Sequence, residues 1–140
     1  MAVQDRNMAA RAATARRILN LGGGAASIVA SATALRKIVW YIGSGVIERF
    51  SVRVFSKANN DNTVTITPTI NGTAISGGAL AITAVAAPQE LTVVLASKIV
   101  PGDVLAFNTG AFAGTAPAFN YMDILFYIRT GGYVVDPDTE

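Results

Sequence analysis

The sequence contains neither cysteine nor histidine. Without cysteine the chain can form no disulfide, no thiolate metal site and no thiol nucleophile. Without histidine it lacks the commonest general base and the commonest transition-metal ligand, which also removes every serine–histidine–aspartate arrangement. Two carboxylates could still support catalysis, but no motif brings a pair of them together. We therefore expect a protein that is not an enzyme and that uses no cofactor or metal.

Charge is also scarce: 14% of the residues are charged, whereas 51% are apolar. An ordinary soluble domain carries about 25% charged residues. Soluble monomers rarely expose large apolar patches, so this composition predicts that other protein covers part of the surface. The net charge of +2 is too small to predict binding of nucleic acid by the whole domain. The composition favours a protein that assembles with copies of itself or with a larger particle.

The 140 residues are enough for one domain, but the N-terminal part differs from the rest. Residues 8–21 are rich in alanine, arginine and leucine, which favour helices, and their apolar positions recur every three or four residues. Three glycines at 22–24 then predict a hinge. We expect residues 1–24 to be a helical or extended arm that docks on a partner, the alternative being a frayed terminus without a role. The residues expected to bind the partner are Arg6, Arg11, Arg16, Arg17 and Leu19.

An uncharged stretch, residues 18–35, is long enough to raise the question of a membrane span. It contains Asn20, three glycines and several serine, threonine and alanine residues, so its hydrophobicity is low for a spanning helix. We interpret it as the end of the arm, the glycine hinge and a first strand at Ser27–Thr33. No membrane association is expected.

After residue 35 the apolar pattern changes to a period of two, which is typical of half-buried strands. Turn residues separate the runs, and Asn71-Gly72 predicts a tight hairpin. Pro68 lacks an amide hydrogen, so its strand is expected at a sheet edge. About eight short strands without intervening helices predict an all-β, antiparallel, jelly-roll-like sandwich over residues 25–135. An acidic tail, residues 136–140, follows it.

Two of the expected strands have distinctive outer faces. In residues 46–56 the alternation directs Val46, Phe50, Val52 and Val54 inward and Arg49, Ser51 and Arg53 outward. Tyrosine and arginine are enriched at protein interfaces, which makes these faces candidates for contact between subunits, although ordinary surface or second-core residues would look the same. The second strand, residues 119–129, has Tyr121, Leu125 and Tyr127 on its outer side. The residues predicted to form an oligomer interface are Arg49, Arg53, Tyr121, Leu125 and Tyr127.

A glycine- and alanine-rich loop, Gly110–Ala118, is flanked by Phe112 and Phe119. Exposed aromatic side chains in loops are typical of sugar-binding sites. A carbohydrate- or receptor-binding fibre domain is therefore the alternative function. A secreted or membrane-associated β-protein is a further possibility, because sandwiches host many functions.

Two segments resemble a known group of proteins. They are Thr65–Ile75, which contains the Asn-Gly turn, and Val100–Phe107, which begins with Val-Pro-Gly-Asp. Over residues 63–110 the chain resembles small β-sandwich proteins of tailed bacteriophages, especially capsid decoration (cement) and head-fibre proteins. The resemblance implies a homotrimer on the capsid surface of the virion, bound to the major capsid protein or another virion protein and sometimes anchored by an N-terminal arm. No functional residue can be transferred from it.

Overall fold

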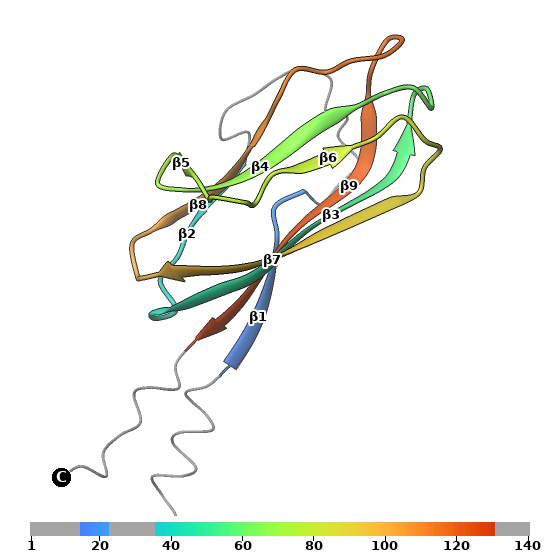
Figure 1. Cartoon of the computed structure of the whole chain (residues 1–140). Helices are drawn as coiled ribbons and strands as arrows, with labels where there is room; N and C mark the ends of the chain where they lie inside the picture. The colour runs from blue at the N-terminus through green and yellow to red at the C-terminus, as the bar shows by residue number, and fades with distance from the viewer. Residues whose placement is uncertain (1–14, 23–35, 131–140) are drawn as a thin grey trace, which may run out of the picture.

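The computed structural model describes residues 15–22 and 36–130. The secondary structure of these residues consists of β-strands alone (Figure 1). The strands are β1 (Ala15–Asn20), β2 (Lys37–Val39), β3 (Gly45–Lys57), β4 (Val64–Ile70), β5 (Thr73–Ala74), β6 (Leu80–Ile82), β7 (Gln89–Ile99), β8 (Val104–Thr109) and β9 (Phe119–Thr130). The predicted all-β class is confirmed. In these same residues no helix is long and apolar enough to cross a membrane.

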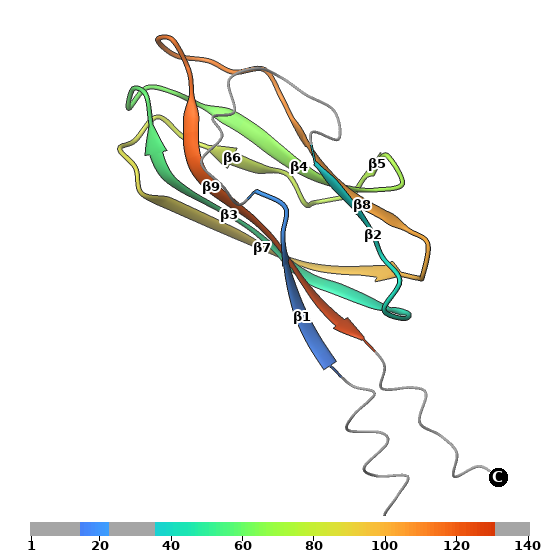
Figure 2. The same ribbon diagram turned by 180° about the vertical axis from the view of Figure 1, so that it is seen from behind.

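The strands form two antiparallel sheets that face each other (Figures 1 and 2). Sheet A has the order β1-β9-β3-β7; sheet B has the order β2-β8-β4, with β5 and β6 both paired to β4. Successive strands alternate between the two sheets from β1 to β4 and from β6 to β9. Between β4 and β6 the chain stays in sheet B, where it also forms the two-residue β5. This connection pattern is that of a jelly roll, so the predicted sandwich is confirmed.

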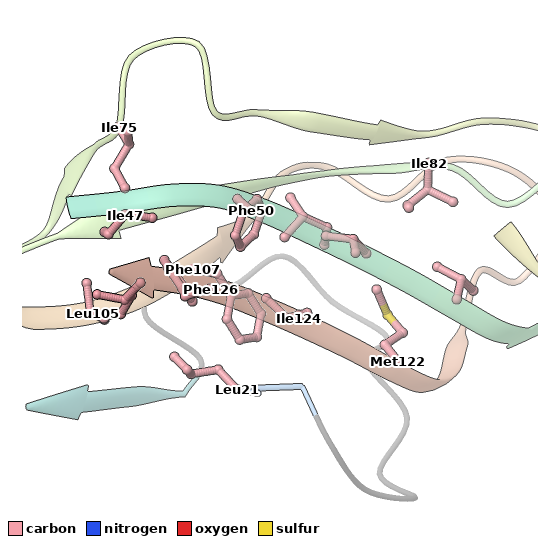
Figure 3. Packing of buried hydrophobic residues seen from close by; sticks show 14 of the residues in the cluster. Leu21, Ile47, Phe50, Ile75, Ile82, Leu105, Phe107, Met122, Ile124 and Phe126 are labelled. Carbon is pink, nitrogen blue, oxygen red and sulfur yellow. The ribbon is translucent and has the colours of Figure 1, made fainter. Parts of the chain in front are cut away.

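The core lies between the sheets (Figure 3). Phe50 of β3 and Phe126 of β9 meet at its centre, with ring centroids 5.0 Å apart. Sheet B covers them with buried residues such as Ile66 and Phe107. One part of the predicted pattern is wrong: a β-bulge between Ile47 and Arg49 shifts the alternation, so Ile47 is buried in place of Val46.

The described end of the arm, residues 15–20, is a strand, so of the two predicted forms, helical or extended, this part takes the extended one. β1 pairs antiparallel with β9, from Ala15 opposite Thr130 to Asn20 opposite Leu125. Pairing with a long strand outweighs a weak helical propensity. This segment is thus an edge strand of the sandwich, inside the part of the chain assigned to the arm. The other expected features of residues 1–14, 23–35 and 131–140, including the strand at 27–33 and the acidic tail, lie outside the described residues.

Gly22 has a packing role at the end of β1, whereas the rest of the predicted hinge, residues 23–24, lies outside the described residues. A Cβ atom on it would lie 2.5 Å from the Met122 carbonyl oxygen and 2.7 Å from the Ile124 nitrogen. Next to it, the Asn20 side-chain oxygen accepts hydrogen bonds from the Gly22 and Ile124 amides, at 3.0 and 3.1 Å. Only glycine allows the chain to pass this close to β9.

The Asn71-Gly72 hairpin is confirmed: both residues have positive φ, 51° and 83°, and the turn joins β4 to β5. The edge position predicted from Pro68 is wrong, because β4 lies inside sheet B between β8 and the short strands β5 and β6. Pro68 is tolerated there because β5 pairs with Thr69 and Ile70 while β6 pairs with residues 64–66. The proline thus faces the break between the two short strands and disrupts no ladder pair.

Candidate functional site

The outer face of sheet A gathers most of the chain's functional candidates on one surface. In β1, β3, β7 and β9 alternate side chains point away from the core, and the bulge in β3 shifts this alternation by one residue. The outer face includes Arg16, Ile18 and Asn20 of β1; Asp123, Leu125, Tyr127 and Arg129 of β9; Val46, Glu48, Arg49, Ser51, Arg53 and Phe55 of β3; and Glu90, Thr92, Val94, Ala96 and Lys98 of β7.

A row of four side chains crosses this face from edge to edge. The strand registers place Ile18 beside Tyr127, Tyr127 beside Arg49, and Arg49 beside Val94. The Arg49 guanidinium carbon lies 4.5 Å from the centre of the Tyr127 ring, which is a cation–π contact. The two ends of the row are open: Ile18 is 60% exposed and Val94 is 78% exposed. These residues line a shallow depression of about 500 Å³, which the neighbouring Glu48 and Arg16 also border.

Glu48 organises the basic side chains around this row. Its carboxylate accepts from Arg129 Nε at 3.1 Å and from Arg16 Nε at 3.4 Å, so it ties β1, β3 and β9 together. The hydrogen bond from Arg129 is the main reason that the pKa of Glu48 lies below its usual value. The bulge directs Glu48 and Arg49 to the same side of the sheet, and this places a carboxylate next to the row.

The other end of the face carries polar side chains. Arg53 lies between Asp123 and Glu90 in the register, and its Nε is 2.7 Å from the Glu90 carboxylate. The hydroxyls of Ser51 and Thr92 are 2.7 Å apart. Charged side chains thus flank the row on both sides, and beyond Arg53 the face also exposes the apolar ring of Phe55.

The structure brings together residues that the sequence had assigned to two separate sites. Arg49, Arg53 and Tyr127, predicted for an oligomer interface, share the outer face with Arg16, predicted for a partner-binding arm. Leu125 points outward, but it is only 6% exposed. The backbone of Tyr121 lies in β9, and its side chain is outside the described part of the chain, as are Arg6 and Arg11.

Two of the arm residues occupy the alternate positions of β1, although Arg17 is exposed and also borders the depression. Arg17 pairs with Ile128 and Leu19 with Phe126, both inward positions of β9, and Leu19 packs against the core. Leu19 is partly buried and contributes to this packing, and its contact with a partner stays a prediction. Sequence reasoning missed Ile18 and Val94, although alternation in their strands could have identified them as outward apolar residues.

The loop Gly110–Ala118 does not present the aromatic side chains that made it a candidate sugar site. Phe119 is fully buried, and Phe112 packs edge-on against it with centroids 5.4 Å apart. The loop is fastened to the β3–β4 turn, where the Asp61 carboxylate accepts from the Thr115 amide and hydroxyl at 3.0 and 2.8 Å. These hydrogen bonds hold the pKa of Asp61 below its usual value. The aromatic residues of this loop belong to the core.

A second exposed apolar group lies at one end of the sandwich. There the β2–β3 loop meets the β7–β8 turn through hydrogen bonds from the Trp40 amide to the Asp103 carbonyl and from the Gly102 amide to the Trp40 carbonyl. Tyr41 in this loop is 73% exposed.

Throughout residues 15–22 and 36–130 no three acidic side chains come together in a way that could hold a metal ion.

Comparison with known proteins finds similarity at the level of the fold. No protein-family model matches the chain, and no curated protein matches its sequence. Among solved structures, the chain is similar to the CBM36-1 domain of a multidomain xylanase from the hindgut metagenome of Trinervitermes trinervoides. The TM-score is 0.55 at 17% sequence identity, and the match covers 81% of this chain and 96% of that domain. Both chains are thus β-sandwiches of one general architecture.

Proposed function

We propose that this protein is a non-catalytic structural module that binds another protein surface through the outer face of sheet A. The observation that carries the proposal is the row from Ile18 to Val94, which exposes apolar side chains at both ends and an arginine–tyrosine pair between them. Arginine and tyrosine are enriched at the centre of protein interfaces, and exposed apolar patches mark sites of interaction. The sequence resemblance to phage decoration proteins makes a virion capsid the particle that we propose it binds.

The pre-arranged side chains of the face support a binding role. Glu48 holds Arg16 and Arg129, and Arg49 rests on the Tyr127 ring, so four long side chains are ordered before any partner arrives. Less conformational entropy is then lost on binding. A module that binds only the assembled shell stabilises that shell by mass action. Several copies joined together, such as the homotrimer implied by the resemblance, would strengthen weak individual contacts through multivalency.

A matched pair of tyrosine substitutions tests the proposal. Tyr127→Ala removes the ring at the centre of the row, whereas Tyr41→Ala makes the same chemical change at the end of the sandwich. In co-sedimentation with empty capsids of the virus that encodes the chain, we expect Tyr127→Ala to weaken binding at least about tenfold, as is usual for an interface hot spot. Tyr41→Ala should bind like the wild type. If the wild-type protein stays in the supernatant, or if both variants co-sediment equally well, the proposal is wrong.

Carbohydrate binding is the second candidate function, and the likeness to a carbohydrate-binding module favours it. Polar side chains that could bind hydroxyl groups, such as Asn20 and Asp123, lie on the same face as Tyr127. The Arg49 guanidinium already covers one side of the Tyr127 ring, which leaves less of it for a sugar, so we place this function second. A glycan array distinguishes the two: saturable binding that Tyr127→Ala abolishes would favour the sugar.

A further inference from the structure

Among the described residues, β7 is one of the two edge strands of sheet A, opposite β1. Its 11 residues, Gln89–Ile99, pair with β3 on one side, and no strand among the described residues pairs with the other side. Exposed and half-buried side chains alternate from Glu90 to Ile99, and neither proline nor glycine interrupts the strand, although its register against β3 shifts between Val94 and Ser97. Proteins usually protect such an edge with a proline, a bulge or central charges. Here the only charges are Glu90 and Lys98, one near each end of the strand.

The side chains of β7 show that this edge is incompletely covered. Val94 is the central residue of β7, points to the outer face and is 78% exposed. On the inner face, Leu91, Val93 and Leu95 pack against the core but remain half-buried, as expected at the border of a sheet. Another strand beside β7 would cover both sets of residues.

We infer that the β7 edge pairs with β7 of a second copy of this chain, antiparallel and about a two-fold axis at Val94. In such a pair, residues opposite each other lie on the same face of the sheet. Val94 then lies opposite the second copy's Val94, and Thr92 lies opposite the second copy's Ala96. Glu90 lies opposite the second copy's Lys98, and the symmetry repeats this contact at the other end.

Charge selects this register over its neighbours. A two-fold axis at Val93 would place Glu90 opposite Ala96, and an axis at Leu95 would place it opposite Val100, outside the strand. Only the axis at Val94 brings both charged pairs into contact, and opposite charges facing each other across a strand pair are stabilising. The same Glu90 carboxylate already contacts Arg53, so it would lie between two cations in the assembly.

The pairing also makes the outer faces continuous. A two-fold axis perpendicular to the sheet keeps both outer faces on the same side. The row from Ile18 to Val94 would therefore meet its symmetry copy, Val94 against Val94, and form one row across two joined sheets. This contact lies at a strand edge and does not depend on the function proposed for the face. It yields a dimer or another even-numbered assembly, in contrast to the homotrimer that the phage resemblance implies.

Charge exchange between two variants tests the register. Lys98→Glu gives a strand with acid at both ends, and Glu90→Lys gives a strand with base at both ends. Each variant alone would face like charges at two symmetric positions, so its dimerisation should weaken by about tenfold or more. An equimolar mixture restores two opposite-charge pairs in a heterodimer and should recover the wild-type association.

Sedimentation analysis of the full chain over a range of concentrations measures all four samples. We expect a mass about twice the 14.5 kDa of one chain for the wild type and for the mixture, and dissociation for each variant alone. Val94→Lys should also dissociate the dimer, whereas Ile42→Lys, at an exposed position in the β2–β3 loop, should not. A wild-type monomer or trimer, or a mixture that associates no better than its components, overturns the inference. Capsid binding by a wild-type monomer would leave the proposed function standing while this pairing fails.

Discussion

Replacing Asn62 with alanine tests whether the Gly110–Ala118 loop is part of the scaffold. Asn62 lies in the β3–β4 turn and is fully buried. Its side-chain oxygen accepts from the Asn59 amide at 2.9 Å and the Ala118 amide at 3.3 Å. Its side-chain nitrogen donates to the Thr115 carbonyl at 2.9 Å and to the Asp61 carboxylate at 3.2 Å. One amide group therefore joins the middle and the last residue of the loop to the turn.

The expected loss follows from these four contacts. A typical intramolecular hydrogen bond contributes about 1 kcal/mol net, and a buried group left without a partner costs about 1–3 kcal/mol. The two longer contacts of Asn62 count for less than the two at 2.9 Å. We expect Asn62→Ala to lower the free energy of unfolding by about 2–4 kcal/mol. For a chain of this size the melting temperature should fall by roughly 10 °C.

Urea denaturation followed by circular dichroism measures this loss, with Asn60→Ala as the control. Asn60 lies in the same turn but is exposed, so its replacement should change stability by less than about 0.5 kcal/mol. A loss below about 1 kcal/mol for Asn62→Ala would show that the loop is not held in this way. The loop would then again be a candidate for binding a ligand.

Two further predictions concern the way β1 is joined to the sandwich. Arg129 and Arg16 lower the pKa of Glu48 in the folded state below its ordinary value of 4.5. The ionised Glu48 carboxylate therefore stabilises the fold fully above pH 4.5, and this stabilisation is lost as the pH falls through the pKa of Glu48 in the folded protein. The difference in unfolding free energy between wild type and Glu48→Gln should therefore shrink on acidification; a difference independent of pH would contradict the ion pairs. Gly22→Ala should destabilise the protein by about 2 kcal/mol or more in thermal unfolding, because its Cβ has no space beside β9. Gly110→Ala, where the nearest atom would be 3.6 Å away, is the matched control, and equal losses in the two variants would refute the packing role.

The bulge in β3 is a small feature with consequences for the whole outer face. In a regular strand Glu48 and Arg49 would point to opposite sides, and one of them would enter the core. The extra residue allows both to face outward while Ile47 and Phe50 stay buried. Bulges often redirect side chains near functional sites, and here one places an acid beside the arginine–tyrosine pair.

The sequence by itself determined the class of the fold and the direction of many side chains. A period of two from residue 35 onward, interrupted by turn residues, leaves a β-sandwich as the natural fold. A tight hairpin turn requires positive φ values, which Asn71 and Gly72 adopt readily. Alternation also placed Arg49 and Arg53 on one face of β3, because side-chain direction in a strand is a local property.

Only the tertiary structure decided which strands are neighbours, and with that the composition of the candidate site. Pairing energy comes from residues far apart in the chain, so local propensity could not reveal that residues 15–20 extend along β9 instead of forming a helix. For the same reason, the contact of Arg49 with Tyr127 and the exposure of Val94 on a free edge could not be predicted. Periodicity specifies the face on which a side chain lies, whereas long-range packing specifies what lies beside it.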